Sequence, residues 1–255
     1  MPVAFLGHLS GDAHGRTLLE ALRADGVALD LVSVGHEPTT RAIAHVDASG
    51  GAGYEFEVEG TSAPALTADL VPHRLPAGVT ALHIGTLGLA LEPIASTLLD
   101  LVARERARRV VMLDPNVRPG AAPDTVYREN LRRAIAMSTI VKASEEDIAW
   151  LGAPPQARLL VVTRGQRGAF AVHEGHRVDV PAVNVDVVDT IGAGDAFGAA
   201  LLAWLFHHDR ATPDLDLDRA ELASALEYAC LAAAITCTRR GADPPTESEM
   251  AARTG

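Results

Sequence analysis

Short apolar runs alternate along the chain with longer segments of helical periodicity. Apolar runs of strand length occupy Val3–Leu6, Leu31–Val34, Val79–Ile84, Val110–Asp114, Thr139–Lys142 and Leu159–Thr163. Apolar positions at helical spacing occupy Gly15–Asp25, Glu92–Arg108, Asp124–Met137, Glu145–Leu151, Ala193–His207 and Arg219–Thr238. A repeated strand–helix alternation is typical of a parallel sheet covered by helices, so the pattern predicts an α/β fold with a mainly parallel central sheet.

Two stretches interrupt this alternation and predict hairpins. In the first, Arg41–Asp47 and Tyr54–Val58 flank a turn through Ser49-Gly50-Gly51, which suggests a small β lid within residues 40–60. In the second, Ala169–Val172 and Arg177–Val180 flank Glu174-Gly175. No stretch reads as a linker between independent domains. We therefore expect residues 1–255 to form a single domain with the lid inserted in it.

Composition narrows the class of protein. The 255 residues are 48% hydrophobic and 22% charged, which is close to soluble globular averages. A net charge of −11 disfavours general binding to nucleic acid or anionic membrane. The uncharged apolar stretches are too short to span a bilayer, and the N-terminus lacks a signal-peptide layout. Cys230 and Cys237 lie about 10.5 Å apart along a predicted helix, beyond disulfide reach. We expect a cytoplasmic protein.

Polar residues follow several of the predicted strands. Asp114-Pro115-Asn116-Val117-Arg118 follows one strand, Ser144-Glu145-Glu146-Asp147 the next, and Thr163-Arg164-Gly165 the one after. Ligands of open parallel sheets bind outside the carboxyl ends of the strands. These segments therefore predict a polar crevice suited to a phosphorylated ligand and a metal.

The sharpest motif is the segment Val187–Phe197. An extended run enters a Gly192-Ala193-Gly194 turn, and a helix follows. Amides at a helix N-terminus bind anions, and glycines let a phosphate approach closely. Asp195 would lie beside that anion site, placed to accept a proton from an attacking hydroxyl.

Other interpretations of this motif fit less well or stay open. Asp195 could merely favour the helix dipole. Gly192, Gly194 and Gly198 form a loose dinucleotide-binding string, but no strand follows the helix to supply a ribose-binding acid. No Gly-x4-Gly-Lys-Ser/Thr motif is present, which excludes a P-loop. His173 and His176 flank a turn without a third metal ligand nearby in sequence.

The segment Asp189-Thr190-Ile191-Gly192-Ala193-Gly194-Asp195-Ala196-Phe197 resembles the C-terminal signature of the PfkB (ribokinase-like) carbohydrate kinases. Further segments follow in the family's order: Asp114–Pro119, Val141–Asp147, Thr163–Ala169 and Gly241 with Pro244-Pro245. The resemblance implies a ribokinase-like three-layer sandwich and transfer of the γ-phosphoryl group of ATP to a sugar hydroxyl.

The resemblance also implies a role for each matching residue. Asp195 would be the base, with Gly192, Ala193 and Gly194 forming the anion hole. Asp147 would order Mg²⁺ through water, and Asp189 and Ile191 would adjoin a K⁺ site. The sugar or phosphate side would be lined by Asn116 and Arg118. The residues bordering ATP would be Ser144, Thr163, Gly165, Gly168 and Thr190.

The sequence also suggests which sugar is the substrate and which parts of the family pattern are missing. Tyr54–Thr61 resembles the lid strand of fructokinases and lacks the Arg of 2-keto-3-deoxygluconate kinases, so fructose ranks first and that keto acid, or the sugar of another PfkB kinase, second. The family's opening strand and its Gly-Gly-x-x-x-Asn block have no counterpart here. A catalytically impaired nucleotide- or sugar-binding remnant is therefore the alternative. A homodimer through the lid is a further expectation.

Overall fold

The computed structural model describes residues 1–46 and 52–254, and these divide into two compact units. The first comprises residues 1–77, 86–104 and 118–133. The second comprises residues 78–85, 105–117 and 134–255. The turn predicted at Ser49-Gly50-Gly51 lies outside the described residues. The single-domain organisation stays a prediction.

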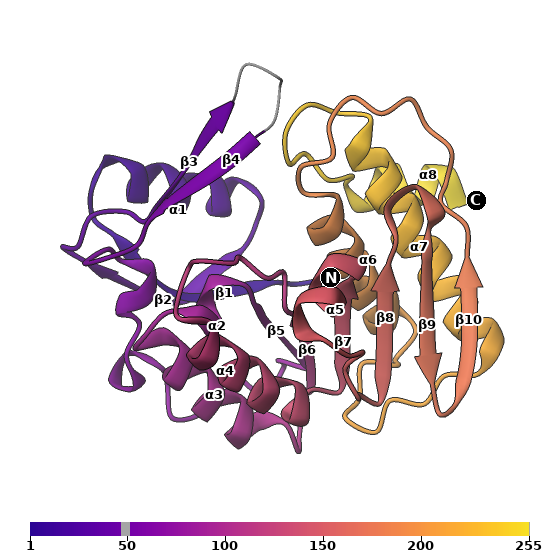
Figure 1. The fold of residues 1–255 in the computed structure, drawn as a ribbon, viewed down its shortest axis with the longest axis horizontal. Helices are drawn as coiled ribbons and strands as arrows, with labels where there is room; N and C mark the ends of the chain where they lie inside the picture. Colours follow the sequence, from indigo (N-terminus) through magenta and orange to yellow (C-terminus); the bar gives the residue numbers. More distant parts are fainter. Residues whose placement is uncertain (47–51, 255) are drawn as a thin grey trace. The chain divides into compact units, whose positions relative to one another are not determined.

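The second unit is built on a six-stranded sheet in the order β10-β9-β8-β7-β6-β5 (Figure 1). β5 to β8 run parallel to one another, whereas β9 and β10 extend the sheet as an antiparallel hairpin. The mainly parallel sheet is therefore confirmed. The strands are β5 (Ala81–Gly85), β6 (Val110–Asp114), β7 (Ile140–Ser144), β8 (Leu159–Thr163), β9 (Ala169–His173) and β10 (His176–Val180).

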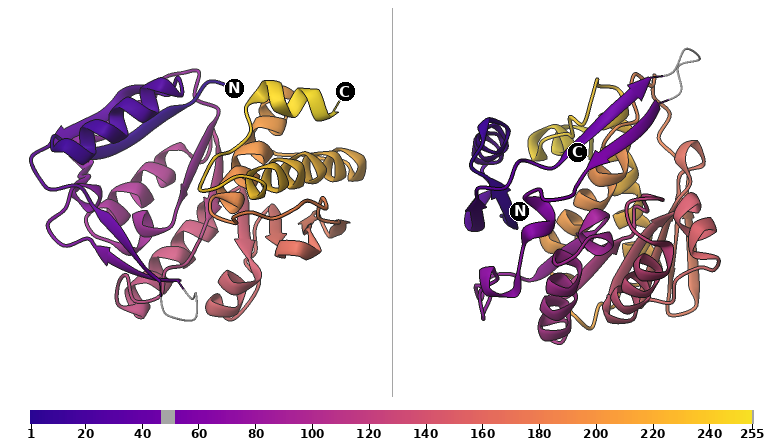
Figure 2. Two further views of the ribbon diagram at one scale, coloured as in Figure 1. Left: turned by 90° about the horizontal axis from the view of Figure 1, so that it is seen from above. Right: turned by 60° about the vertical axis from the view of Figure 1, so that its left-hand side comes forward.

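The first unit contains two small sheets. β1 (Ala4–Ser10) and β2 (Ala28–Gly35) form a parallel pair, with α1 (Ala13–Ala24) packed along them (Figure 2). Asp12 caps α1 because its carboxylate accepts the Gly15 amide at 2.8 Å. β3 (Arg41–Val46) and β4 (Ala52–Glu57) form the predicted hairpin. Within the described residues, neither pair joins the six-stranded sheet.

Three further helices follow β5 along the chain. The short α2 (Leu87–Ala90) was not predicted, because one helical turn carries no periodicity. The helix predicted at Glu92–Arg108 is shorter, and forms α3 (Ile94–Glu105). Pro93 restricts Glu92 to extended backbone, and the Arg108 and Arg109 amides fold back onto the Glu105 carbonyl. α4 (Asp124–Met137) has the predicted bounds.

The core of the second unit lies where α6 (Ala193–His207) and α7 (Arg219–Cys237) pack against each other and α7 packs against β9 and β10. By length and composition alone α7 could cross a membrane, because its mean hydropathy reaches 1.3. Buried α7 residues such as Leu226 and Ala229 lie in the core cluster. We therefore interpret α7 as a core helix whose apolar surface serves folding.

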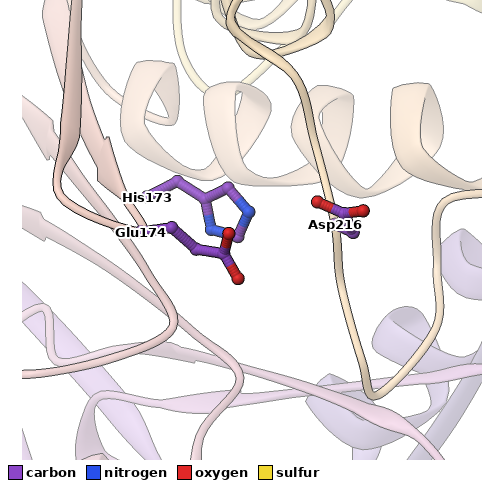
Figure 3. Close-up of side chains that lie close together, drawn as sticks. All are labelled: His173, Glu174 and Asp216. Carbon is purple, nitrogen blue, oxygen red and sulfur yellow. The ribbon is translucent and has the colours of Figure 1, made fainter.

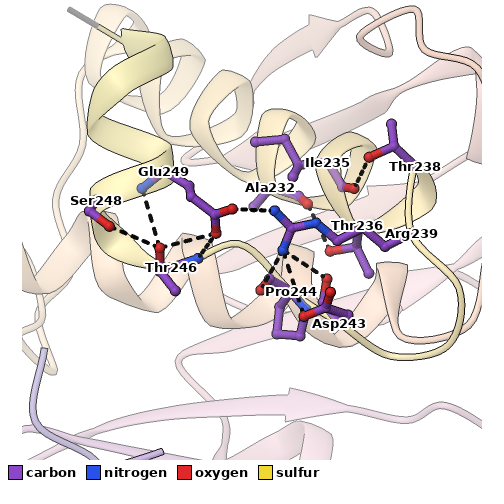
Figure 4. Close-up of polar contacts among 10 residues, drawn as sticks. All are labelled: Ala232, Ile235, Thr236, Thr238, Arg239, Asp243, Pro244, Thr246, Ser248 and Glu249. Carbon is purple, nitrogen blue, oxygen red and sulfur yellow. Dashed lines mark hydrogen bonds and ion pairs between the residues drawn. The ribbon is translucent and has the colours of Figure 1, made fainter.

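Arg239, which follows α7, holds the C-terminal segment in place. Arg239 forms ion pairs with Asp243 and with Glu249 of α8 (Glu247–Thr254), and it donates to the Pro244 carbonyl (Figure 4). The Glu249 carboxylate also accepts the Thr246 amide at 2.8 Å, which caps α8. These contacts fix the turn through Gly241 and Ala242, which contacts the site described next.

Candidate active site

The carboxyl ends of the parallel strands bring the predicted polar segments to one edge of the sheet. Asp114 ends β6, Ser144 ends β7 and Thr163 ends β8. Because these strands are neighbours in the sheet, their ends meet at the same edge. The edge predicted to hold the chemistry is therefore present in the second unit.

The first turn of α6 is shaped by Gly192. Its backbone is left-handed, with φ of 78°, and an added Cβ would lie 2.7 Å from the Ala242 Cβ. Only glycine meets both conditions without strain. The Ala193 amide bonds the Thr190 carbonyl at 3.2 Å. The amides of Gly194 and Asp195 belong to the first turn, where a helix provides no acceptor, so they can bind an anion.

Asp195 is exposed in this first turn. Its carboxylate thus reaches solvent beside the anion-binding amides. A base that deprotonates an attacking hydroxyl needs this combination of access and proximity to the reacting phosphorus. The geometry matches the role predicted for Asp195, which stays a prediction.

A cavity of about 280 Å³ adjoins the start of α6. That volume lies near the lower end of the range for small-molecule sites, roughly 300–1,000 Å³. Six residues predicted to bind the nucleotide or phosphate line it: Thr163, Gly165, Gly168, Thr190, Ala193 and Gly194. The β8–β9 connection and the α6 N-terminus therefore form one pocket.

Most of the remaining cavity wall was not predicted from the sequence, although Gln166, Val187 and Phe197 lie within segments singled out there. It is mostly apolar: the loop after β10 gives Ala182, Val183, Val185 and Val187, α6 gives Phe197, α7 gives Cys230, Ala233, Ala234 and Cys237, and the β8–β9 connection gives Gln166. One sequence feature could have predicted this wall: α7 has no polar face. One side of the helix is buried in the core, and another side lines the cavity. Such a wall can pack against the face of a flat ring.

Asp147 lies in a capping box at the start of α5 (Glu145–Leu151). Its carboxylate accepts the Ser144 amide and hydroxyl, each at 2.8 Å, and the Val117 amide at 2.7 Å. Ser144 and Asp147 therefore stabilise the start of α5, a structural role that needs no ligand. A carboxylate with these partners fits Mg²⁺ held through water, since Mg²⁺ prefers oxygen ligands and keeps several waters.

The two residues predicted on the sugar side belong to different units. Asn116 follows β6 in the second unit and has a left-handed backbone, φ 37°. Arg118 begins a segment of the first unit. The roles predicted for these two side chains stay predictions.

Asp189 ties the loop before α6 to the end of α7. Its two carboxylate oxygens accept the Ile191 amide at 3.0 Å and the Gly241 amide at 2.8 Å. These bonds lower the pKa of Asp189, with the Ile191 amide the largest cause and the Gly241 amide the second. Asp189 and Ile191, predicted to adjoin K⁺, thus lie in a loop held in place by hydrogen bonds.

The sequence pattern of the pfkB family of carbohydrate kinases matches residues 1–249. The chain belongs to the pfkB family. Members of this carbohydrate kinase family are phosphotransferases with an alcohol group as acceptor. The predicted family and the ribokinase-like fold are therefore confirmed.

Relatives of this pfkB chain include fructokinases. It is 37% identical over 218 residues to a fructokinase of Rhizobium leguminosarum bv. trifolii, an alignment that covers 80% of this chain and 66% of the relative. Fructokinase from Xylella fastidiosa with bound ATP superposes with a TM-score of 0.89 at 24% identity, covering 98% of this chain and 84% of that one. A fructokinase double mutant from Vibrio cholerae O395, with fructose, ADP and a potassium ion bound, superposes with a TM-score of 0.82 at 25% identity. The match covers 98% of this chain and 84% of that one.

The two cysteines of this kinase are free, as predicted, and both line the cavity. Burial raises the pKa of Cys230 to about 11 from 9.0, and the charge of Glu227 adds to that rise. Burial likewise raises the pKa of Cys237, with Asp189 adding to it. At neutral pH both side chains are therefore thiols, which attack electrophiles far more slowly than thiolates do.

Alkylation by iodoacetamide is expected to be slow at pH 7.5 and to accelerate as pH rises, Cys230 reaching its plateau only above about 11. ATP is expected to slow labelling at both cysteines because it would fill the cavity that they line. Mass spectrometry of the modified peptides gives the rate at each residue. Labelling that ATP leaves unchanged at both positions would contradict a nucleotide in this cavity.

A second group of side chains, His173, Glu174 and Asp216, lies close enough together to suggest a metal (Figure 3). His173 Nδ1 lies 2.9 Å from the Arg158 carbonyl, and Nε2 accepts the Leu217 amide at 3.3 Å. Both ring nitrogens thus have backbone partners, and Glu174 lies 3.7 Å from the Arg158 guanidinium. We interpret His173 as a structural residue that joins β8, β9 and the loop before α7.

Proposed function

We propose that this chain is an ATP-dependent sugar kinase that transfers the γ-phosphoryl group to a hydroxyl of fructose. The observation that carries the proposal is the first turn of α6, where the exposed Asp195 carboxylate and helix N-terminal amides adjoin a cavity of about 280 Å³. Phosphoryl transfer needs positioning, charge stabilisation and a base for the hydroxyl, and this arrangement offers all three.

The chain's own residues divide the work. Asp195 accepts the proton of the attacking hydroxyl as the oxygen–phosphorus bond forms. The amides following Gly192 hold the negative charge of the phosphoryl group in transit. Thr163, Gly165, Gly168 and Thr190 border the nucleotide phosphates, and the apolar wall receives the base.

Two cations complete the proposed site. Mg²⁺, held through water by Asp147, would neutralise charge on the nucleotide phosphates. K⁺ beside Asp189 and Ile191 would support the loop before α6, a proposal supported by the potassium ion in the Vibrio cholerae structure. Ser144 shares the capping box with Asp147, and we place it beside the nucleotide for that reason.

Fructose is preferred over a sugar acid for a reason of charge. The arginine of the β3–β4 hairpin, Arg41, donates to the Glu57 carboxylate at 2.7 Å. A guanidinium already paired with a carboxylate is a poor partner for a substrate carboxylate. The fructokinase relative and the fructose in the Vibrio cholerae structure support the same preference.

The test is ADP release by this chain with Mg-ATP and K⁺. The panel contains fructose, 2-keto-3-deoxygluconate, ribose and a blank without sugar. We expect fructose-dependent ADP release, with fructose giving the highest kcat/KM. A higher kcat/KM on another sugar would retain the kinase but overturn fructose. ATP binding by calorimetry without any sugar-dependent ADP would favour the binding-only alternative.

A further inference from the structure

Lys142 is the single lysine of the chain, whose other 21 Lys or Arg positions are all Arg. It lies on β7 and is buried, with 6% of its side chain exposed. A fully charged ammonium in a buried position is rare unless it is paired. The surroundings of Lys142 must therefore explain why this buried position carries a lysine in a chain whose other basic residues are all arginines.

The surroundings of Lys142 are the edge of the sheet described above. Its Nζ lies 2.6 Å from Asp114 Oδ2, and the Asp114 side chain is 5% exposed. The other oxygen, Asp114 Oδ1, is buried without a hydrogen-bond partner among the described residues. Burial raises the pKa of the Asp114 carboxyl, and the Lys142 ammonium opposes that rise.

The ammonium also lies under the first turn of α6. An added Cβ on Gly194 would be 3.2 Å from Lys142 Nζ. His83 connects the same group of charges: burial lowers the pKa of His83, and the charges of Asp114, Lys142 and Asp195 also act on it. Three strands and α6 therefore bring His83, Asp114, Lys142 and Asp195 into one electrostatic neighbourhood.

This placement runs against the preference of the helix. The N-terminus of a helix carries partial positive charge, which disfavours a cation beside it. Asp114 compensates Lys142 in the resting protein. Positive charge gathered at an N-terminus becomes favourable when an anion binds, because the ammonium and the amides then act on the same charge.

We propose that Lys142, held by Asp114, is a positioning residue of the phosphoryl-transfer site. Its ammonium supports the first turn of α6 from below and adds positive potential where the phosphoryl group passes. The inference rests on the assignment of Gly192–Asp195 to that site. It adds a charge that the signature segment Asp189–Phe197 does not contain.

Lysine suits the position better than arginine. The guanidinium is a wide planar fork, whereas the ammonium is a compact point charge. The space above Nζ is limited by the backbone of Gly194. Lys142→Arg is therefore expected to displace the first turn of α6 and to retain little of the activity.

The competing interpretation is a purely structural ion pair. Asp114 and Lys142 lie just beyond Leu113 and Val141, the last pair of the β6–β7 ladder, while Asp114 pairs with Gly85 of β5 and Lys142 with Val161 of β8. Replacing both charges of a buried pair by apolar residues is often neutral or stabilising, whereas removing one is costly. The double variant Asp114→Leu/Lys142→Met should therefore fold even where Lys142→Met alone does not. It allows the loss of the Lys142 charge to be tested in a folded protein.

The decisive measurement is binding of ADP with and without aluminium fluoride, a mimic of the phosphoryl group in transit, by calorimetry in Mg²⁺ and the preferred sugar. For Lys142→Met and the double variant, we expect ADP affinity within about threefold of wild type and loss of roughly 10²-fold in the extra affinity given by aluminium fluoride. kcat is expected to fall by a similar factor, with the KM for ATP little changed. Arg210→Met, which removes an exposed cation paired with Glu221, is the matched control.

Two results would overturn the proposal. One is a folded Lys142→Met or double variant that keeps the wild-type preference for ADP with aluminium fluoride. The other is a double variant with wild-type kcat, which would leave the pair a purely structural role. Asp195→Asn is measured alongside, because full turnover in that variant would refute the assigned transfer site itself, whichever result Lys142 gives.

Discussion

Asp195→Asn is expected to lower kcat by roughly 10²–10⁴-fold, the usual contribution of a general base. The amide cannot accept the proton of the attacking hydroxyl, but it retains the size and polarity of the carboxylate. Because Asp195 is exposed and lies outside the core, the melting temperature should change little. Coupled ADP release and thermal melting measure the two effects separately.

The matched control for this variant lies beyond the other end of α6. Asp209→Asn removes an exposed carboxylate just past the helix C-terminus, far from the first turn. It should leave kcat within about twofold of wild type, as surface changes usually do. Turnover of Asp195→Asn within about tenfold of wild type would refute Asp195 as the base.

Gly168→Ala is expected to produce the second large effect, through the backbone of the cavity. Gly168 has φ of 80°, and an added Cβ would lie 2.1 Å from the Val180 carbonyl oxygen and 2.5 Å from the Ala182 amide nitrogen. Both contacts are with backbone, so the β8–β9 connection or the loop after β10 must move. Conformational strain and overpacking together should cost roughly 2–5 kcal/mol and weaken ATP binding.

Gly165 provides a control in the same loop. It also has a positive φ, of 55°, and also lines the cavity, but an added Cβ would meet nothing within 4 Å. Gly165→Ala should therefore cost only the left-handed conformation, about 1–2 kcal/mol. Chemical denaturation and ATP titration compare the pair. Equal losses in the two variants would contradict the backbone clash at Gly168.

Local sequence determined the second unit's elements closely. β6, β8, α5 and α6 have the bounds predicted from apolar periodicity and capping residues, and so does α4, most of which belongs to the first unit. These elements carry their own start signals, such as Ser144 with Asp147 for α5. The polar edge was predictable for the same reason, because strand ends and helix starts are local features and parallel strands align their carboxyl ends.

The pairing of β1 and β2 shows the limit of local patterns. Both strands were predicted, but an apolar run does not say which strand it joins. Likewise the segment 182–187 alternates apolar and polar residues, yet it lines the cavity as a loop. Strand pairing and loop placement depend on long-range contacts that periodicity does not encode.

The sequence by itself determined the family, the mainly parallel sheet and the motif that ends in Asp195, because each rests on neighbouring residues. Only the tertiary structure placed Lys142 of β7 under the first turn of α6 and against Asp114 of β6, and gave the cavity its apolar wall from α7. Those contacts join residues far apart along the chain. Burial and electrostatic field are properties of the assembled strands and helices, so no local pattern could have specified them.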